Sequence, residues 1–208
     1  MSFKKLLGTW LVCALIVTAA TAVSIRWLDI PIAQLYAHNI NRLAPIGDRL
    51  GSSILISGEL FLMAILITIR LSLGYLSDLG KAILISILAS LTAFAANDAV
   101  LKVFFGLPNP GMFLFFGADH TFHFFHGNIE SSFPSGHMAL AAGAAIAIAR
   151  VYSRFLLPLM GSILVPAAAL IIGDWHFLSD VIAGIFIGAT AGFIAGELWV
   201  QHSGRNTA

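Results

Sequence analysis

Residues 177–200 read FLSDVIAGIFIGATAGFIAGELWV, and this stretch decides the fold class. Its charged residues are Asp180 and Glu197, and a membrane-spanning helix needs about 20 mostly apolar residues. The apolar runs along the chain are continuous, whereas the strands of a membrane barrel alternate over about ten residues. The stretch therefore predicts a transmembrane helix.

Five further apolar stretches extend this prediction to the whole chain. The six expected spans cover approximately residues 6–25, 54–73, 79–105, 134–152, 155–172 and 176–200. We therefore expect an all-α polytopic membrane protein, a six-transmembrane-helix bundle that forms one membrane-embedded domain over residues 1–208.

The composition supports this fold class and excludes several others. Apolar residues make up 59% of the 208 residues and charged residues 10%, whereas a soluble domain carries roughly 25% charged residues. The chain therefore lacks the polar surface of a soluble enzyme or a disordered protein. Eleven Lys and Arg against ten Asp and Glu do not supply the basic face of a nucleic-acid binder. The single cysteine, Cys13, excludes an internal disulfide and a Cys-based metal cluster.

Basic residues set the expected orientation, because cytoplasmic loops carry an excess of Lys and Arg. With a cytoplasmic N-terminus, the residues facing the cytoplasm are Lys4, Lys5, Arg70, Lys81, Arg150, Arg154 and Arg205. The residues facing outward are then Arg26, Arg42 and Arg49. We expect an integral protein of the inner (plasma) membrane whose two long loops, 26–53 and 106–133, lie on the outer side.

The first span shares features with a signal peptide. Lys4 precedes an apolar run, and Ala20-Thr21-Ala22 resembles a cleavage site. The run continues past that site to Ile25, so we expect an uncleaved span, although the sequence leaves cleavage of residues 1–22 open.

One face of the last span consists of glycines, which are Gly184, Gly188, Gly192 and Gly196. Glycines at this spacing let a neighbouring backbone approach closely. The face predicts either packing inside the bundle or contact between copies in a homo-oligomer.

Polar residues gather at three positions that this topology places at the outer face. Lys102 ends the third span, residues 131–137 (SSFPSGH) open the fourth, and residues 174–180 (DWHFLSD) open the sixth. Ionisable side chains inside spans are costly and mark functional sites. Asp98 and Lys102, four residues apart on one helix, could also simply neutralise each other.

The two helix starts supply complementary chemistry. Pro134 suits the first turn of a helix, and the N–H groups that follow Ser135 attract an anion. His137 in that turn can donate or accept a proton near neutral pH. His176 and Asp180 stack on one helix face, where the carboxylate can orient the imidazole as a nucleophile.

In this order the residues resemble the type 2 phosphatidic acid phosphatase superfamily, which also includes vanadium haloperoxidases. The signature of that superfamily is Lys-x6-Arg-Pro, then Pro-Ser-Gly-His, then Ser-Arg-x5-His-x3-Asp. The chain has Lys102-x6-Asn109-Pro110, then Pro134-Ser135-Gly136-His137, then Ala169-Leu170-x5-His176-x3-Asp180.

The resemblance implies hydrolysis of a lipid phosphate or diphosphate monoester at the outer membrane face, without a metal or other cofactor. By position, His176 would attack phosphorus and form a phosphohistidine, Asp180 would orient it, and His137 would protonate the leaving alkoxide. The phosphate-binding residues would be Lys102, Ser135, Gly136 and Asn109. The expected partners are the lipid phosphate and the surrounding membrane lipids.

Both arginines of the signature are absent, because Asn109 and Leu170 stand in their places, and Ala169 replaces the serine. Arginine offers phosphate a bidentate, permanently charged fork, and losing one oxyanion donor costs roughly 2.7–4 kcal/mol. Other donors could replace the arginines, and the candidates are Asn109, Trp175, His120, His123 and His126. Alternatively, the same histidine serves a lipid phosphotransferase, or the bundle binds or transports lipids without catalysis.

The second long loop carries histidines and many phenylalanines. His120, His123 and His126 lack a rigid ligand spacing, so we expect no metal there. The phenylalanines are Phe113, Phe115, Phe116, Phe122, Phe124 and Phe125. They predict either a loop in the headgroup layer that admits a lipid substrate or a plain lid over the bundle.

Overall fold

The computed structural model describes residues 3–37, 44–128 and 131–203, and these ranges are built from helices and contain no strand. The all-α prediction is therefore confirmed. Helical runs long and apolar enough to cross a membrane are Lys4–Tyr36, Gly51–Leu73, Asp78–Phe105, Ser153–Ile172 and Leu178–Ser203. A sixth apolar helix, α7 (Gly136–Val151), has 16 residues and is shorter than these.

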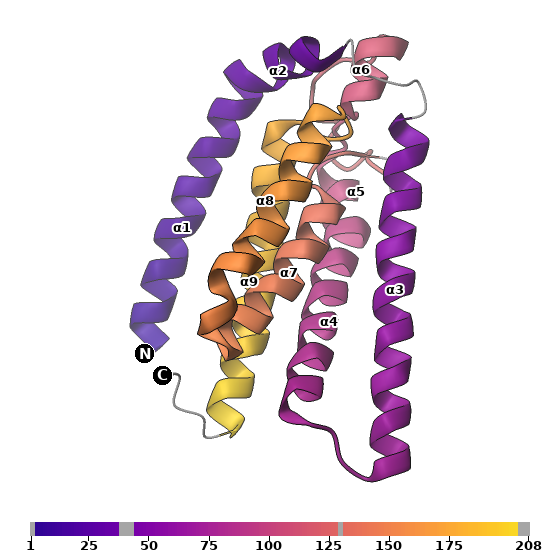
Figure 1. The fold of residues 1–208 in the computed structure, drawn as a ribbon. Coiled ribbons are helices and arrows are strands. Elements are labelled where there is room, and N and C mark those ends of the chain that lie inside the picture. Colours follow the sequence, from indigo (N-terminus) through magenta and orange to yellow (C-terminus); the bar gives the residue numbers. More distant parts are fainter. Residues whose placement is uncertain (1–2, 38–43, 129–130, 204–208) are drawn as a thin grey trace.

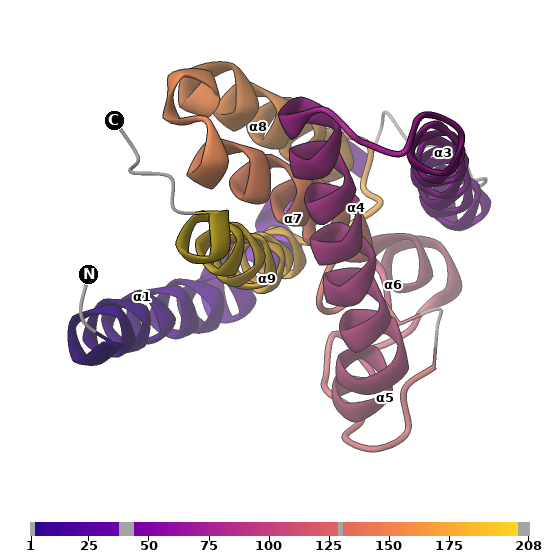
Figure 2. The ribbon, with the colours of Figure 1, turned by 90° about the horizontal axis from the view of Figure 1, so that it is seen from below.

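α7 lies in the middle of the bundle, against α4 (Asp78–Ala96), α8 (Leu156–Ile172) and α9 (Leu178–Ser203). Figures 1 and 2 show α1 (Phe3–Val23) and α3 (Ala44–Leu73) on the outside, with the other long helices between them. The helices beside α7 cover most of its side chains. This short helix therefore forms the core of the bundle.

The glycine face of α9 packs on α7. A Cβ atom at Gly184, Gly188 or Gly192 would lie 2.4 Å from a backbone carbonyl oxygen of α7, closer than any side chain allows. The oxygens belong to Ser135, Ala139 and Gly143, in that order. The face is thus used for packing inside the bundle, which is the first of its two predicted uses; a homo-oligomer through it stays a prediction.

At one end of the bundle the helices extend further than predicted. α1 continues through the π-helical turn η1 (Ser24–Leu28) into α2 (Asp29–Tyr36), and α3 begins at Ala44 rather than at residue 54. The expected outer loop 26–53 is therefore largely helical where the structure describes it, and its place on the outer side stays a prediction. Hydropathy marks only the apolar part of a helix, so it missed these more polar turns.

The third predicted span contains a π-helical turn near its end. After α4 come the π-helical turn η3 (Asn97–Leu101) and the short helix α5 (Lys102–Phe105), which ends at Gly106 with φ of 61°. The loop that follows contains one more short helix, α6 (Pro110–Phe116). A π-helical turn shifts the helix face that follows it and is common at functional sites.

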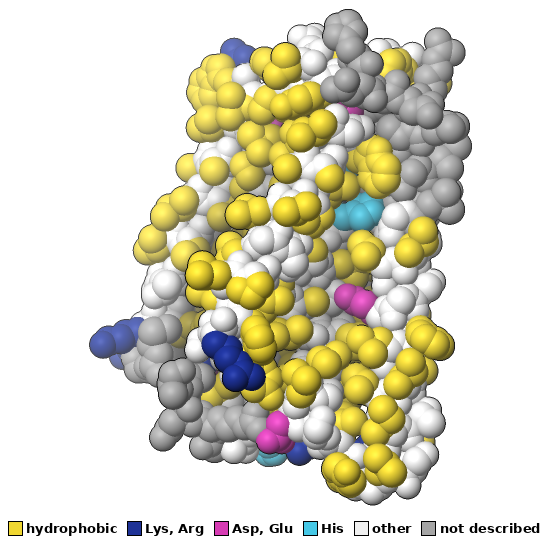
Figure 3. Space-filling model, in the orientation of Figure 1, with side chains coloured by type: hydrophobic (Ala, Val, Ile, Leu, Met, Phe, Trp, Pro, Cys, Tyr) yellow, Lys and Arg dark blue, Asp and Glu magenta, His cyan; other side chains and the backbone are white. Residues whose placement is uncertain are grey.

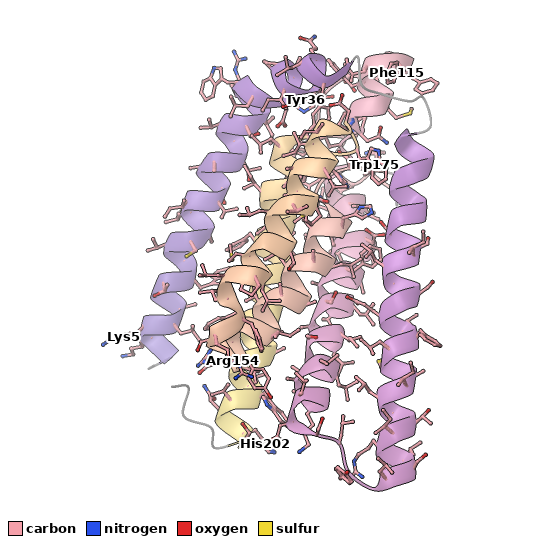
Figure 4. All side chains as sticks on the ribbon, in the orientation of Figure 1. Lys5, Tyr36, Phe115, Arg154, Trp175 and His202 are labelled. Carbon is pink, nitrogen blue, oxygen red and sulfur yellow. The ribbon has the colours of Figure 1, made fainter. Side chains whose placement is uncertain are left out.

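The sides of the bundle are apolar, as Figure 3 shows for one face. Large exposed side chains include Leu15, Phe61 and Leu157, the last 82% exposed. Lys5, Arg154 and His202 lie at one end, and Tyr36, Phe115 and Trp175 lie at the other (Figure 4). An apolar surface between two more polar ends suits a bilayer, and the chain is an integral membrane protein.

Candidate active site

The first turn of α7 is held tightly by its neighbours. Ser135 is fully buried, and its Oγ accepts a hydrogen bond from the Met138 N–H at 3.4 Å. Gly136 is the first helical residue, and a Cβ there would lie 2.9 Å from the Phe94 ring of α4. Glycine therefore lets the N-terminus of α7 pack directly on α4, and this N-terminus is suited to an anion.

The imidazole of His176 lies just before α9 and is paired with a carboxylate. His176 Nδ1 lies 3.3 Å from Asp180 Oδ2, and both side chains are almost completely buried. Asp180 Oδ2 also accepts a hydrogen bond from the Phe177 N–H at 2.8 Å. The carboxylate is thus fixed by the backbone and in turn orients the ring, whose other nitrogen, Nε2, is on the opposite side from Asp180.

The two helix starts meet. The ring centroids of His137 and His176 are 5.8 Å apart, with an angle of 71° between the ring planes. The Ser135 N–H donates to the Asp180 carbonyl oxygen at 3.0 Å. A carboxylate-oriented imidazole and a second imidazole therefore lie next to each other, which brings a candidate nucleophile and a candidate proton donor together.

A cation lies beside the start of α7. Lys102 Nζ is 3.1 Å from Asp98 Oδ1, and Lys102 is 5% exposed. The same Asp98 oxygen lies 3.4 Å from the Cβ position of Gly136. The Asp98–Lys102 pair that the sequence left as an alternative is present, and it places the ammonium next to the helix N-terminus.

Two polar contacts of the site were missed by the sequence analysis. Asn97 is fully buried in η3 and donates from Nδ2 to the Pro134 carbonyl oxygen at 2.9 Å. Ser52 of α3 places its Oγ 3.3 Å from His137 Nε2. The position of Asn97 inside an apolar run could have indicated its role, whereas the sequence around Ser52 contains no such signal.

Residues 80–203 match the PAP2 superfamily. The chain belongs to this superfamily. The match includes all three motifs and indicates a phosphatase. No curated protein and no solved structure matches the chain. That residues 1–208 form one domain stays a prediction.

The PAP2 chain has no phosphate donor at the position of the third-motif arginine. Leu170 is 6% exposed and packs in an apolar cluster with Met138, Ile163 and Val181. Its backbone, not its side chain, serves the site, since the Leu170 carbonyl oxygen accepts from the His176 N–H at 3.3 Å.

Asn109 has a structural contact in this PAP2 chain. Its Oδ1 accepts from the Met112 N–H at 2.9 Å and caps α6. The preceding Pro108 offers its carbonyl oxygen to Ser132 Oγ at 3.3 Å, so the loop runs past the segment that opens α7. The Asn109 amide nitrogen is the group left to donate to phosphate, and this role stays a prediction.

The other candidate donors lie at different distances from the site. Trp175 lies near the site, with its ring centroid 6.1 Å from that of His137. His123 pairs with Asp119 at the surface at 2.9 Å, and His126 Nδ1 contacts the Phe124 carbonyl oxygen. Among the described residues, no group of three or more His, Cys, Asp or Glu is placed to hold a metal ion.

A second carboxylate lies in the turn that carries His176. Asp174 is 2% exposed and has φ of 50°, in the left-handed region. Its Oδ2 atom has no hydrogen-bond partner among the described residues. Burial away from water disfavours the charged form and raises the pKa of the Asp174 carboxyl to about 7.

Proposed function

We propose that this PAP2 protein is a metal-independent phosphatase that hydrolyses a lipid phosphate or diphosphate through a phosphohistidine on His176. The observation that carries the proposal is the 5.8 Å approach of the His137 and His176 rings, with Asp180 bound to the latter at 3.3 Å. A phosphoryl group bound beside both rings can be attacked by His176 and protonated on its leaving oxygen by His137.

The reaction has two steps. In the first, His176 Nε2 forms a bond to phosphorus while the bond to the lipid oxygen breaks, and His137 gives that oxygen a proton. In the second, His137 takes a proton from water, whose oxygen attacks phosphorus and releases inorganic phosphate and the free imidazole. Asp180 stabilises the cationic ring that forms in between.

Developing negative charge on the phosphoryl oxygens requires fixed donors. Lys102 and the N–H groups at the start of α7 are the proposed donors, with Ser135 holding that turn in place. The apolar sides of the bundle support a lipid as the substrate, because such a molecule reaches the site from within the bilayer. We further propose that the site lies at the outer face of the inner membrane, opposite the end that carries Lys5 and Arg154.

A second function is favoured by one observation, the burial of Leu170 in an apolar cluster where the family signature has an arginine. A site that lacks the two arginines of the signature suits a protein that binds or transports lipid phosphates without hydrolysing them. Trapping of an acid-labile phosphohistidine separates the two functions.

The test is phosphate release by the purified protein in detergent, over a panel of lipid phosphates, with a chelator present. We expect release by the wild type and none by His176→Ala. His123→Ala is the matched control, because it removes an exposed imidazole from the surface. Activity that survives in His176→Ala, or that requires a divalent cation, contradicts the mechanism.

A further inference from the structure

A second buried carboxylate contacts the helix that follows His176. Asp29 opens α2 and is 1% exposed. From the preceding π-helical turn η1, Ser24 Oγ donates to Asp29 Oδ1 at 2.6 Å. From α9, Ser179 donates twice, through its backbone N–H to Oδ1 at 3.0 Å and through its Oγ to Oδ2 at 2.6 Å. Asp29 therefore joins the N-terminal segment to the first turn of α9.

This contact satisfies a need of α9. The first N–H groups of a helix have no partner within the helix, and a negative charge is favourable beside them. Asp180 accepts the Phe177 N–H at 2.8 Å from within the same turn, while Asp29 accepts that of Ser179 from another helix. The two carboxylates together fix the backbone on both sides of Leu178.

The outer loop contacts the same carboxylate. His120 Nε2 lies 3.4 Å from Asp29 Oδ2, and the His120 side chain is 5% exposed. Its ring packs edge-on against Phe177, with the centroids 4.4 Å apart. Phe177 directly follows His176, so the Asp29–His120 pair contacts both the residue after the proposed nucleophile and the residue before Asp180.

We propose that Asp29 is a positioning residue for His176. Through Ser179 it fixes the first turn of α9, and this keeps the His176–Asp180 pair at its observed distance from His137. His120 packs against the same turn. The inference rests on the proposed function of His176. Asp29 lies outside residues 80–203, which match the PAP2 superfamily. The N-terminal helical run Lys4–Tyr36, a candidate membrane span, therefore also contributes to the site.

Two serines provide a matched test. Ser24 and Ser179 are both fully buried, and each donates from Oγ to Asp29 at 2.6 Å, but only Ser179 belongs to α9. We expect Ser24→Ala and Ser179→Ala to lower the melting temperature by similar amounts. Ser179→Ala should lower kcat about tenfold or more with KM changed by about twofold at most, because small displacements of reacting groups slow chemistry strongly. Ser24→Ala should leave kcat within about twofold of the wild type.

Asp29→Asn and His176→Ala complete the experiment. Asp29→Asn keeps the shape of the side chain, and we expect the rate of phosphohistidine formation to fall as in Ser179→Ala. If the two serine variants change kcat equally, or if neither changes it, the positioning role is rejected. If His176→Ala retains activity, the proposed function itself is rejected, whatever the serine variants do. Should Asp29→Asn not fold, the serine pair still decides.

Discussion

Ser135, the cap of α7, donates its backbone N–H to the carbonyl oxygen of Asp180 at 3.0 Å. This bond joins the starts of α7 and α9, and His137 lies two residues after Ser135 while His176 lies four residues before Asp180. The separation of the two imidazoles is therefore set by backbone contacts rather than by flexible side chains. Such preorganisation is what a two-histidine mechanism requires.

Gly184→Ala tests this close approach. A Cβ at Gly184 would lie 2.4 Å from the Ser135 carbonyl oxygen and 3.1 Å from Met138 Cβ, so α9 must move away from α7. We expect a loss of stability of about 1–3 kcal/mol, typical of overpacking, together with a fall in kcat. Melting temperature and phosphate release measure the two effects.

Gly161→Ala in α8 is the matched control, because a Cβ there meets nothing within 4 Å. It should leave activity unchanged and stabilise the helix by up to about 1 kcal/mol. Equal effects of the two substitutions would contradict the close-packing explanation.

His137→Asn tests the proton donor through the leaving group. Without a general acid, we expect the rate of phosphohistidine formation from a lipid phosphate to fall by about 10²–10⁴-fold. The rate of its formation from p-nitrophenyl phosphate should fall much less, since the phenolate leaves without a proton. Pre-steady-state kinetics with both substrates isolate this first step from the later attack of water, and an equal loss in it for both would show that His137 does not protonate the leaving oxygen.

Asp174→Asn tests the effect of a buried carboxyl on stability against pH. The carboxyl has a pKa of about 7 in the folded chain against 3.8 when unperturbed. Between these values the folded chain keeps a proton that the unfolded chain has released, so the stability contributed by Asp174 falls as pH rises from about 4 to about 7. Asn tolerates the left-handed backbone and cannot ionise.

The melting temperature of Asp174→Asn relative to the wild type should therefore increase from pH 5 to pH 8. Asp119→Asn is the control, because the pKa of this exposed carboxyl is lowered by hydrogen bonds from Thr121 and His123. A difference between Asp174→Asn and wild type that does not vary with pH would rule out the raised pKa.

Leu170→Arg restores the arginine of the family signature, yet we expect it to destabilise this chain. The guanidinium would enter the apolar cluster of Met138, Ile163 and Val181, and a buried charge without a partner is costly. Leu170→Met, which conserves volume, should change stability by less than about 1.5 kcal/mol. A stable Leu170→Arg protein with faster phosphate release would show instead that the wild-type structure can accommodate the arginine of the family signature at position 170.

The sequence predicted the long helices and the two helix starts well, for a physical reason. Continuous apolar runs such as 177–200 can satisfy their backbone in a bilayer only as helices. The motif residues Ser135 and His176 sit at helix starts because Pro134 and the turn at 173–176 end the preceding segments. Both signals are local, so the sequence alone reveals them.

The parts that the sequence could not reveal depend on distant contacts. Asp29 contacts Ser179 across the bundle, and Ser52 reaches His137 from a helix that carries no motif. Leu170 departs from the family signature, and its apolar neighbours include residues from other parts of the chain. Each of these placements is decided by which helix faces which, and apolar spans of similar composition do not encode that pairing locally.

Lys5 and His202 lie at one end of the bundle, and Trp175 lies at the other beside the site. For a chain that spans the bilayer, this geometry would make the proposed hydrolysis release its product on one side only. Liberated phosphate enters the compartment opposite to any reporter fused near Lys5 or His202. Sealed vesicles whose reporters are all accessible to protease should therefore accumulate the product in their lumen.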